Sequence, residues 1–133
     1  MEVLSNKPKI AIIGLGYVGL PLAIAFGNHY PTIGFDINQQ RVDELIKGID
    51  HTLQSSKDSI EQAKQLKFSN EVHSIKDCTI FVVTVPTPVN ATKEPDLSFL
   101  LVASKMIGGV LKKGDIVLMD CGCSVQGYAS DIT

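Results

Sequence analysis

Cysteine is scarce in this sequence, and its scarcity argues against both a disulfide-stabilised secreted domain and a cysteine-based metal site. Among 133 residues there are three, Cys78, Cys121 and Cys123. An odd and small number does not build the disulfide framework of a secreted domain, so we expect a reducing, cytoplasmic environment. Cys121 and Cys123 do not make a zinc site either, because tetrahedral zinc needs four ligands and no second pair is present. We therefore predict no metal.

Long apolar runs and an excess of basic charge are also missing. No apolar run reaches the roughly 20 residues that cross a bilayer, and residues 1–9 lack the apolar stretch of a signal peptide. The formal net charge is −2, from 12 basic and 14 acidic residues, and Lys112-Lys113 is a pair rather than a run. Such a balance disfavours a broad nucleic-acid surface. We expect a soluble protein whose partners include neither nucleic acid nor a membrane.

The residues that are present suffice for one domain with five strands. The hydrophobic content is 44%, which is ordinary for a chain with a real core. We interpret residues 1–8 as a flexible lead and residues 9–133 as a single domain. Short runs rich in β-branched residues predict buried strands. These runs are residues 9–13, 32–36, 66–69, 79–85 and 116–119.

Helical spacing of apolar residues predicts helices between these strands. The first runs from about Val18 to Phe26, with Val18, Leu22 and Phe26 on its inner stripe. Asn38 is expected to cap the second helix. The inner face of that helix is predicted to hold Val42, Leu45, Ile46 and Ile49.

Two further helices are expected later in the chain. Asp58 and Glu61 have the spacing of a capping box for the third helix, and Asp96 is expected to cap the fourth. The inner stripe of the fourth helix is predicted to hold Leu97, Leu100, Leu101, Ile107 and Leu111. Strands that alternate with helices in this way predict right-handed crossovers and a mostly parallel sheet with helices on both faces.

A glycine-rich turn follows the first strand and opens the first helix. It reads Gly14-Leu15-Gly16-Tyr17-Val18-Gly19. Gly14 permits the tight turn, Gly16 lets a pyrophosphate approach the backbone, and Gly19 lets the helix pack on the strand. The first N–H groups of the helix point at the phosphates. In this setting the motif indicates a Rossmann-like, doubly wound α/β domain that binds a dinucleotide.

The second strand ends in an acid that selects the dinucleotide. Asp36 lies 22 residues after Gly14, where a carboxylate accepts hydrogen bonds from the adenosine ribose hydroxyls. Because a carboxylate repels the additional phosphate of NADP, we predict NAD. Arg41 complicates this prediction, since an arginine can hold a 2′-phosphate. We interpret it as a neighbour of the ribose or adenine, with a solvated helix residue as an equal alternative.

Two stretches give the sequence a family resemblance. The stretches are residues 12–23 (IIGLGYVGLPLA) and 83–89 (VTVPTPV). Together, and at this separation, they resemble the UDP-glucose/GDP-mannose dehydrogenase family. Within that family the resemblance is greatest to the UDP-N-acetylhexosamine 6-dehydrogenases. The resemblance extends over roughly residues 9–118. It implies that Val85, Pro86 and Thr87 form a loop under the cofactor. The predicted cofactor-binding residues are therefore Gly14, Leu15, Gly16, Tyr17, Val18, Gly19, Asp36, Ile37, Arg41, Val85, Pro86 and Thr87.

The resemblance also implies a reaction. Such enzymes oxidise the C6 alcohol of a nucleotide sugar to a carboxylate with two NAD molecules, through a thioester on a cysteine. That cysteine, a lysine and most of the UDP-sugar site lie in a central helix and a second domain, which follow the NAD-binding domain. No catalytic residue is thus expected among these 133 residues, and the chain alone should bind NAD without turnover. The full-length enzyme is expected to be a homodimer.

After Leu118 the sequence departs from the family pattern. The family has an acid, Ser-Thr-Val and a Pro-Gly turn, whereas residues 119–127 read MDCGCSVQG. Ser124 could supply the hydroxyl that contacts the cofactor and a catalytic water. Two alternatives therefore remain open. One is a stand-alone NAD-sensing module, which predicts a closed fold with no exposed apolar surface near the carboxyl end. The other is the cofactor domain of a β-hydroxyacid or prephenate-type dehydrogenase.

Overall fold

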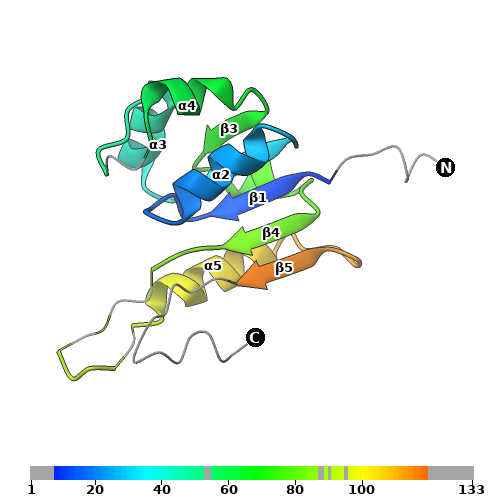
Figure 1. Ribbon diagram of the computed structural model, residues 1–133. Coiled ribbons are helices and arrows are strands. Elements are labelled where there is room, and N and C mark those ends of the chain that lie inside the picture. Colours follow the sequence, from blue (N-terminus) through cyan, green and yellow to red (C-terminus); the bar gives the residue numbers. More distant parts are fainter. Residues whose placement is uncertain (1–7, 53–54, 87–88, 90, 95, 120–133) are drawn as a thin grey trace.

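Five parallel strands form the centre of the molecule (Figure 1). The computed structural model describes residues 8–52, 55–86, 89, 91–94 and 96–119. The sheet has the order β3-β2-β1-β4-β5, and every pairing is parallel. The strands are β1 (Ile10–Ile13), β2 (Thr32–Phe35), β3 (Leu66–Ser69), β4 (Ile80–Val83) and β5 (Ile116–Met119). The sequence predicted all five strands, with ends within two residues of those observed.

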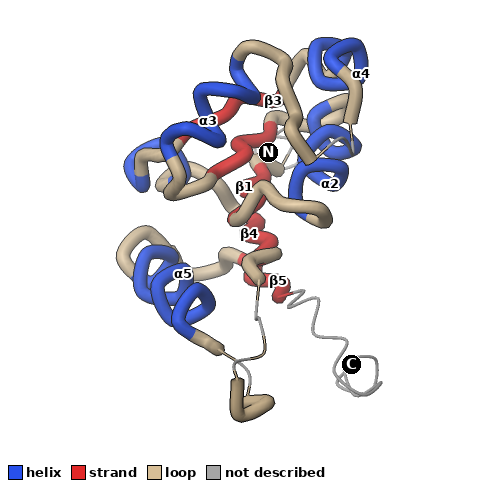
Figure 2. Tube along the Cα trace, turned by 90° about the vertical axis from the view of Figure 1, so that its left-hand side faces the viewer, coloured by secondary structure: helices blue, strands red, loops and turns tan. Residues whose placement is uncertain are grey.

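Helices cover both faces of this sheet, as predicted. They are α2 (Gly19–Gly27), α3 (Gln39–Ile46), α4 (Lys57–Gln62) and α5 (Ser98–Gly108), with a 3-10 helix, η1 (Val72–Ile75). Figure 2 shows α2 and α5 on opposite sides of the strands. Ile12 of β1 packs in the core with residues of α2, whereas Ile13 packs in a second core with residues of α5. The domain is therefore a doubly wound α/β fold.

The inner face of α2 differs from the predicted stripe. Its buried residues are Gly19, Leu20, Ala23, Ile24 and Gly27. Leu22 and Phe26 are only partly buried, and Val18 is 46% exposed. Gly19, Ala23 and Gly27 recur every four residues, and such small residues let a helix lie close to a sheet. The prediction was based on large apolar residues and therefore missed these small buried ones.

The inner face of α5 matches the predicted stripe in part. Ala103 and Ile107 are the buried residues of this helix. Leu100, Met106 and Val110 pack beside them. The predicted inner residues Leu97, Leu101 and Leu111 are 44–64% exposed. Ile107 and Leu100 were thus predicted correctly, and the small buried residue Ala103 was missed.

Corrections to the other two helices are smaller. Asn38 caps α3 as predicted, and Val42 and Leu45 are buried, but Ile46 and Ile49 are at least 50% exposed because α3 ends at Ile46. The capping box of α4 consists of Ser56 and Ser59 rather than Asp58 and Glu61, because the helix begins one residue before Asp58. Asp96 is not the cap of α5 as predicted, because the cap position is Leu97, but Asp96 accepts a hydrogen bond from the Ser98 N–H at the first residue of the helix.

The strand β5 is apolar yet exposed. Its residues Ile116, Val117, Leu118 and Met119 are 37–53% exposed, although alternate residues of a strand point to opposite faces. A closed stand-alone module does not predict this exposure. No described helix is long and apolar enough to cross a membrane.

Candidate cofactor-binding site

The glycine turn lies where β1 ends, between β2 and β4, at the point where the strand order reverses. Gly14 has a φ of +98°, which L side chains rarely adopt. A Cβ on Gly19 would lie 1.7 Å from the Gly14 carbonyl oxygen, whereas a Cβ on Gly16 would meet nothing within 4 Å. Gly14 and Gly19 are thus required by the fold itself. The empty space over Gly16 is what a bound pyrophosphate needs.

The turn presents unoccupied backbone donors to that space. Among the described residues, the N–H groups of Gly16, Tyr17, Val18 and Gly19 make no hydrogen bond. The Leu15 N–H differs, because it donates to Asp36 Oδ2 over 2.9 Å. The N–H groups that remain can converge on an anion at the start of α2, where the helix dipole also favours negative charge.

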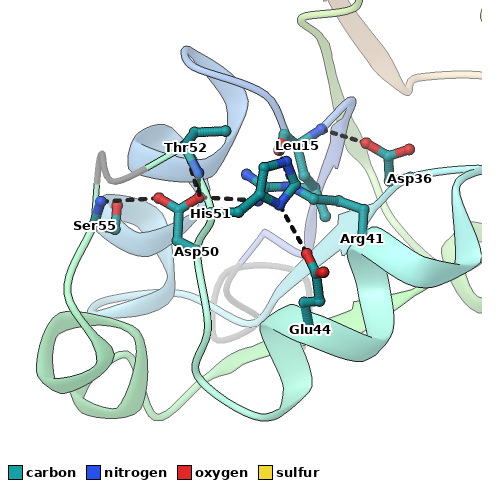
Figure 3. A network of polar contacts seen from close by, with 8 residues as sticks. All are labelled: Leu15, Asp36, Arg41, Glu44, Asp50, His51, Thr52 and Ser55. Atoms are coloured by element: carbon teal, nitrogen blue, oxygen red, sulfur yellow. Dashed lines mark hydrogen bonds and ion pairs between the residues drawn. The ribbon is translucent and has the colours of Figure 1, made fainter.

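Leu15 is a fixed point of the glycine turn. Its side chain is fully buried. Its N–H is bound by Asp36, and its carbonyl accepts a hydrogen bond of 2.8 Å from Arg41 Nε (Figure 3). Two side chains from the next strand and helix thus hold the turn in one conformation. A preformed turn lowers the entropy cost of binding a ligand.

Asp36 is positioned by two backbone donors. Oδ2 accepts from Leu15 N and Oδ1 accepts from Asn38 N, each over 2.9 Å. A carboxylate oxygen has two lone pairs, so both oxygens can still accept hydrogen bonds from a ribose. The sequence predicted that Asp36 is a ligand for ribose. The structure adds that the same carboxylate fixes the glycine turn.

Arg41 and Asp50 form a buried ion pair behind the turn. Arg41 is 6% exposed, and its Nη1 lies 2.9 Å from Asp50 Oδ1. Burial raises the pKa of Asp50, but hydrogen bonds from Thr52, Arg41 and Ser55 outweigh it and hold this pKa at about 2. Asp50 is therefore ionised at neutral pH. The alternative interpretation of Arg41 as a solvated helix residue is wrong.

Two pockets meet at the turn. The smaller, of about 70 Å³, is mainly apolar, and the larger, of about 530 Å³, is mixed in character. Gly14, Asp36 and Pro86 line both. The smaller pocket is also lined by Ile13, Phe35, Ile37, Val85, Phe99, Val102, Ala103 and Met106. The larger is also lined by Leu15, Gly16, Asn38, Gln40, Arg41, Glu44, His51 and Thr52.

The structure brings most of the predicted site residues together. All of those it describes line one pocket or the other except Tyr17, Val18 and Gly19. Tyr17 and Val18 directly precede α2, and Gly19 is its first residue. Thr87, Ser124 and the pair Cys121 and Cys123 lie outside the described residues. That these positions contact a cofactor stays a prediction.

Sequence reasoning missed Thr84. This buried residue follows β4, and its hydroxyl donates to the Gly14 carbonyl over 2.7 Å. Thr84 Oγ1 would also lie 2.5 Å from a Cβ on Gly19. Thr84 therefore joins the glycine turn to the segment that begins the Val-Pro-Thr-Pro loop. The only signal in the sequence was a polar residue at the end of an otherwise apolar strand.

The three histidines and Cys78 are residue types that often take part in catalysis, and none of them is among the predicted cofactor-binding residues. His29, His51 and His73 are exposed. His51 also lines the larger pocket, and its Nδ1 pairs with Glu44 Oε1 over 2.8 Å. Cys78 is fully buried, and burial raises the pKa of its thiol to about 11. A thiol that stays protonated is a poor nucleophile.

A parallel sheet with a glycine turn at its switch point, free N–H groups and an acid after β2 defines a dinucleotide-binding domain. Comparison with known proteins makes this assignment more specific. Residues 8–131 match the model of the UDP-glucose/GDP-mannose dehydrogenase family, NAD binding domain. The chain belongs to this family, and its cofactor is NAD.

The relatives agree with this assignment. The chain is 49% identical over 125 residues to UDP-N-acetyl-D-glucosamine 6-dehydrogenase of Salmonella typhi, covering 91% of this chain and 29% of the relative. It is 50% identical over 112 residues to the Pseudomonas aeruginosa enzyme of the same name, covering 84% and 26%. The solved UDP-D-ManNAc dehydrogenase of Pyrococcus horikoshii superposes with a TM-score of 0.79 at 30% identity, covering 84% and 28%. The chain thus spans less than a third of these relatives.

Proposed function

We propose that this chain is the NAD-binding part of a nucleotide-sugar 6-dehydrogenase that oxidises the C6 alcohol of a UDP-sugar to a uronate. Identities of 49% and 50% to two UDP-N-acetyl-D-glucosamine 6-dehydrogenases support UDP-N-acetylglucosamine or a related UDP-N-acetylhexosamine as the substrate. Bound NAD accepts the hydride in such a reaction. We place the full-length enzyme in the cytoplasm as a homodimer.

The site suggests how the pyrophosphate and the adenosine of NAD are held. The pyrophosphate is placed over Gly16, against the free N–H groups of residues 16–19. The adenosine ribose donates its hydroxyls to Asp36, and the adenine enters the mainly apolar pocket between Ile37 and α5. Pro86 lines both pockets and so lies beside this path. The space over Gly16 is the observation on which this placement rests.

Binding and turnover can be tested separately. Titration of the 133-residue chain should show saturable NAD binding and clearly weaker NADP binding. Equal or tighter binding of NADP would contradict the role given to Asp36. With UDP-N-acetylglucosamine and NAD, the isolated chain should form no NADH. The catalytic cysteine and lysine that the family resemblance implies belong to the domain that follows the NAD-binding domain. A longer form that includes them should form two NADH for each UDP-sugar, and one that oxidises no UDP-sugar would refute the proposal.

A further inference from the structure

An arginine beside the ribose acid conflicts with a preference for NAD. Arg41 lines the same pocket as Asp36. A guanidinium at this edge of a dinucleotide site is well suited to hold the 2′-phosphate of NADP, because its planar fork matches phosphate oxygens. From the sequence alone, Asp36 therefore favours NAD and Arg41 favours NADP. The surroundings of the guanidinium resolve this conflict.

Two of the three guanidinium nitrogens of Arg41 are bonded to protein atoms, and the third is buried. Nε donates to the Leu15 carbonyl over 2.8 Å, and Nη1 donates to Asp50 over 2.9 Å. Nη2 is buried from solvent and, among the described residues, has no hydrogen-bond partner. The residue as a whole is only 6% exposed. A phosphate in the pocket therefore cannot reach a free N–H of this guanidinium unless the side chain moves.

Asp50 is built to hold the guanidinium in this position. Its side chain is 0% exposed. Besides Arg41, it accepts hydrogen bonds from Thr52 N and Oγ1 over 3.0 and 2.6 Å, and from Ser55 N over 3.0 Å. Figure 3 shows this carboxylate on the far side of Arg41 from Asp36. A fixed, ionised carboxylate both neutralises the arginine and directs it away from the ribose.

We propose that Asp50 is a specificity-determining residue, which excludes NADP by restraining the positive charge of Arg41. The inference rests on the proposed NAD site. With Arg41 neutralised, a 2′-phosphate faces Asp36 and Glu44. The other potential cation that lines this pocket, His51, pairs with Glu44 over 2.8 Å. Asp50 does not contact the cofactor in this proposal. It acts by keeping the guanidinium of Arg41 from binding the 2′-phosphate of NADP.

The test is the ratio of the NADP and NAD dissociation constants, measured by titration of the 133-residue chain. Asp50→Asn keeps the shape of the side chain and releases Arg41, so this ratio should fall by about tenfold, the effect of one charge-assisted hydrogen bond. If Asp50→Asn merely loosened the glycine turn, the binding of both cofactors would weaken equally and the ratio would stay unchanged. Asp43→Asn, which removes the same charge from the exposed side of α3, is the matched control.

A second variant shows whether the effect passes through Arg41. In the double variant Arg41→Met with Asp50→Asn, the buried charges are both absent and the ratio should stay within about twofold of the original. This variant also remains informative if Asp50→Asn alone does not fold, because replacing both members of a buried ion pair is better tolerated than removing one.

Three results would overturn the proposal: an unchanged ratio in a folded Asp50→Asn chain, an equal fall in Asp43→Asn, or a tenfold rise of the ratio in the double variant. The last would mean that Arg41 already assists NADP in the original chain. Failure of the proposed NAD site looks different, since the original chain would then bind no NAD at all. Failure of the proposed reaction would appear only in the longer form, as a lack of UDP-sugar oxidation. Circular dichroism and thermal unfolding confirm that each variant is folded before titration.

Discussion

Gly16 and Gly19 lie three residues apart in one turn, yet alanine should have different effects at the two positions. At Gly19 the added Cβ would lie 1.7 Å from the Gly14 oxygen and 2.5 Å from Thr84 Oγ1. Unbonded carbon and oxygen atoms rarely approach within about 3 Å. The turn and α2 must therefore separate by more than about 1 Å. Overpacking of this kind costs up to about 3 kcal/mol, a large part of the roughly 5–15 kcal/mol that stabilises a domain.

At Gly16 the same substitution meets no protein atom within 4 Å. Gly16 also lacks the positive φ of Gly14. Alanine there should leave the free energy of unfolding unchanged or raise it by about 0.4–1 kcal/mol, because it restricts the unfolded chain. The methyl group would occupy the space assigned to the pyrophosphate, so NAD affinity should fall by at least about tenfold.

Urea unfolding without cofactor and NAD titration with folded protein measure these two effects independently. Gly19→Ala should lose stability and consequently binding, whereas Gly16→Ala should lose binding alone. If Gly16→Ala binds NAD as tightly as the original chain, the pyrophosphate does not lie over Gly16. If Gly19→Ala unfolds at the original urea concentration, the close approach of turn and helix has been misjudged.

Three other residues allow further tests. Asp36→Asn should destabilise the fold by about 1–3 kcal/mol and weaken NAD binding, since its amide N–H₂ must face one of two backbone donors; a variant that matches the original in urea unfolding and NAD titration would argue against this. Thr84→Val removes the donor to Gly14 and should cost about 1 kcal/mol in urea unfolding, whereas Thr84→Ser should cost less; equal losses would show that the hydroxyl is not responsible. The folded pKa of Asp50, about 2, lies below its ordinary 3.8. Its contribution of about 2 kcal/mol is thus present above pH 4 and lost as the pH falls toward 2; Asp50→Asn should flatten this part of the stability profile, and an unchanged profile would exclude Asp50 as its source.

The sequence predicted the strands, the sheet class and the glycine turn because each rests on local patterns. Strands such as Ile10–Ile13 are apolar on both faces, and their order along the chain determines the crossovers. The inner faces of α2 and α5 were predicted only in part, because a pattern of large apolar residues passes over buried small ones such as Ala23 and Ala103. Hydrophobic size does not reveal where two elements approach most closely.

The parts of the site that escaped prediction are long-range. Thr84 bonds to a carbonyl 70 residues earlier in the chain, and Arg41 reaches Leu15 across 26 residues. No periodicity records such a contact. Asp50 gave even less signal, since it lies in a polar stretch where a carboxylate looks solvated. Its burial depends on how residues 50–55 fold over Arg41, which only the assembled structure shows.

The exposed strand β5 has a consequence for handling the chain in solution. Its apolar side chains point to both faces, and no described strand pairs with its second edge. Unprotected apolar edges of this kind recruit other strands and lead to aggregation. Colloidal stability should be poorest near the isoelectric point of about 5.8, where net repulsion between molecules vanishes. Light scattering should therefore rise with protein concentration most steeply near that pH, and titrations are best made in dilute solution well above it.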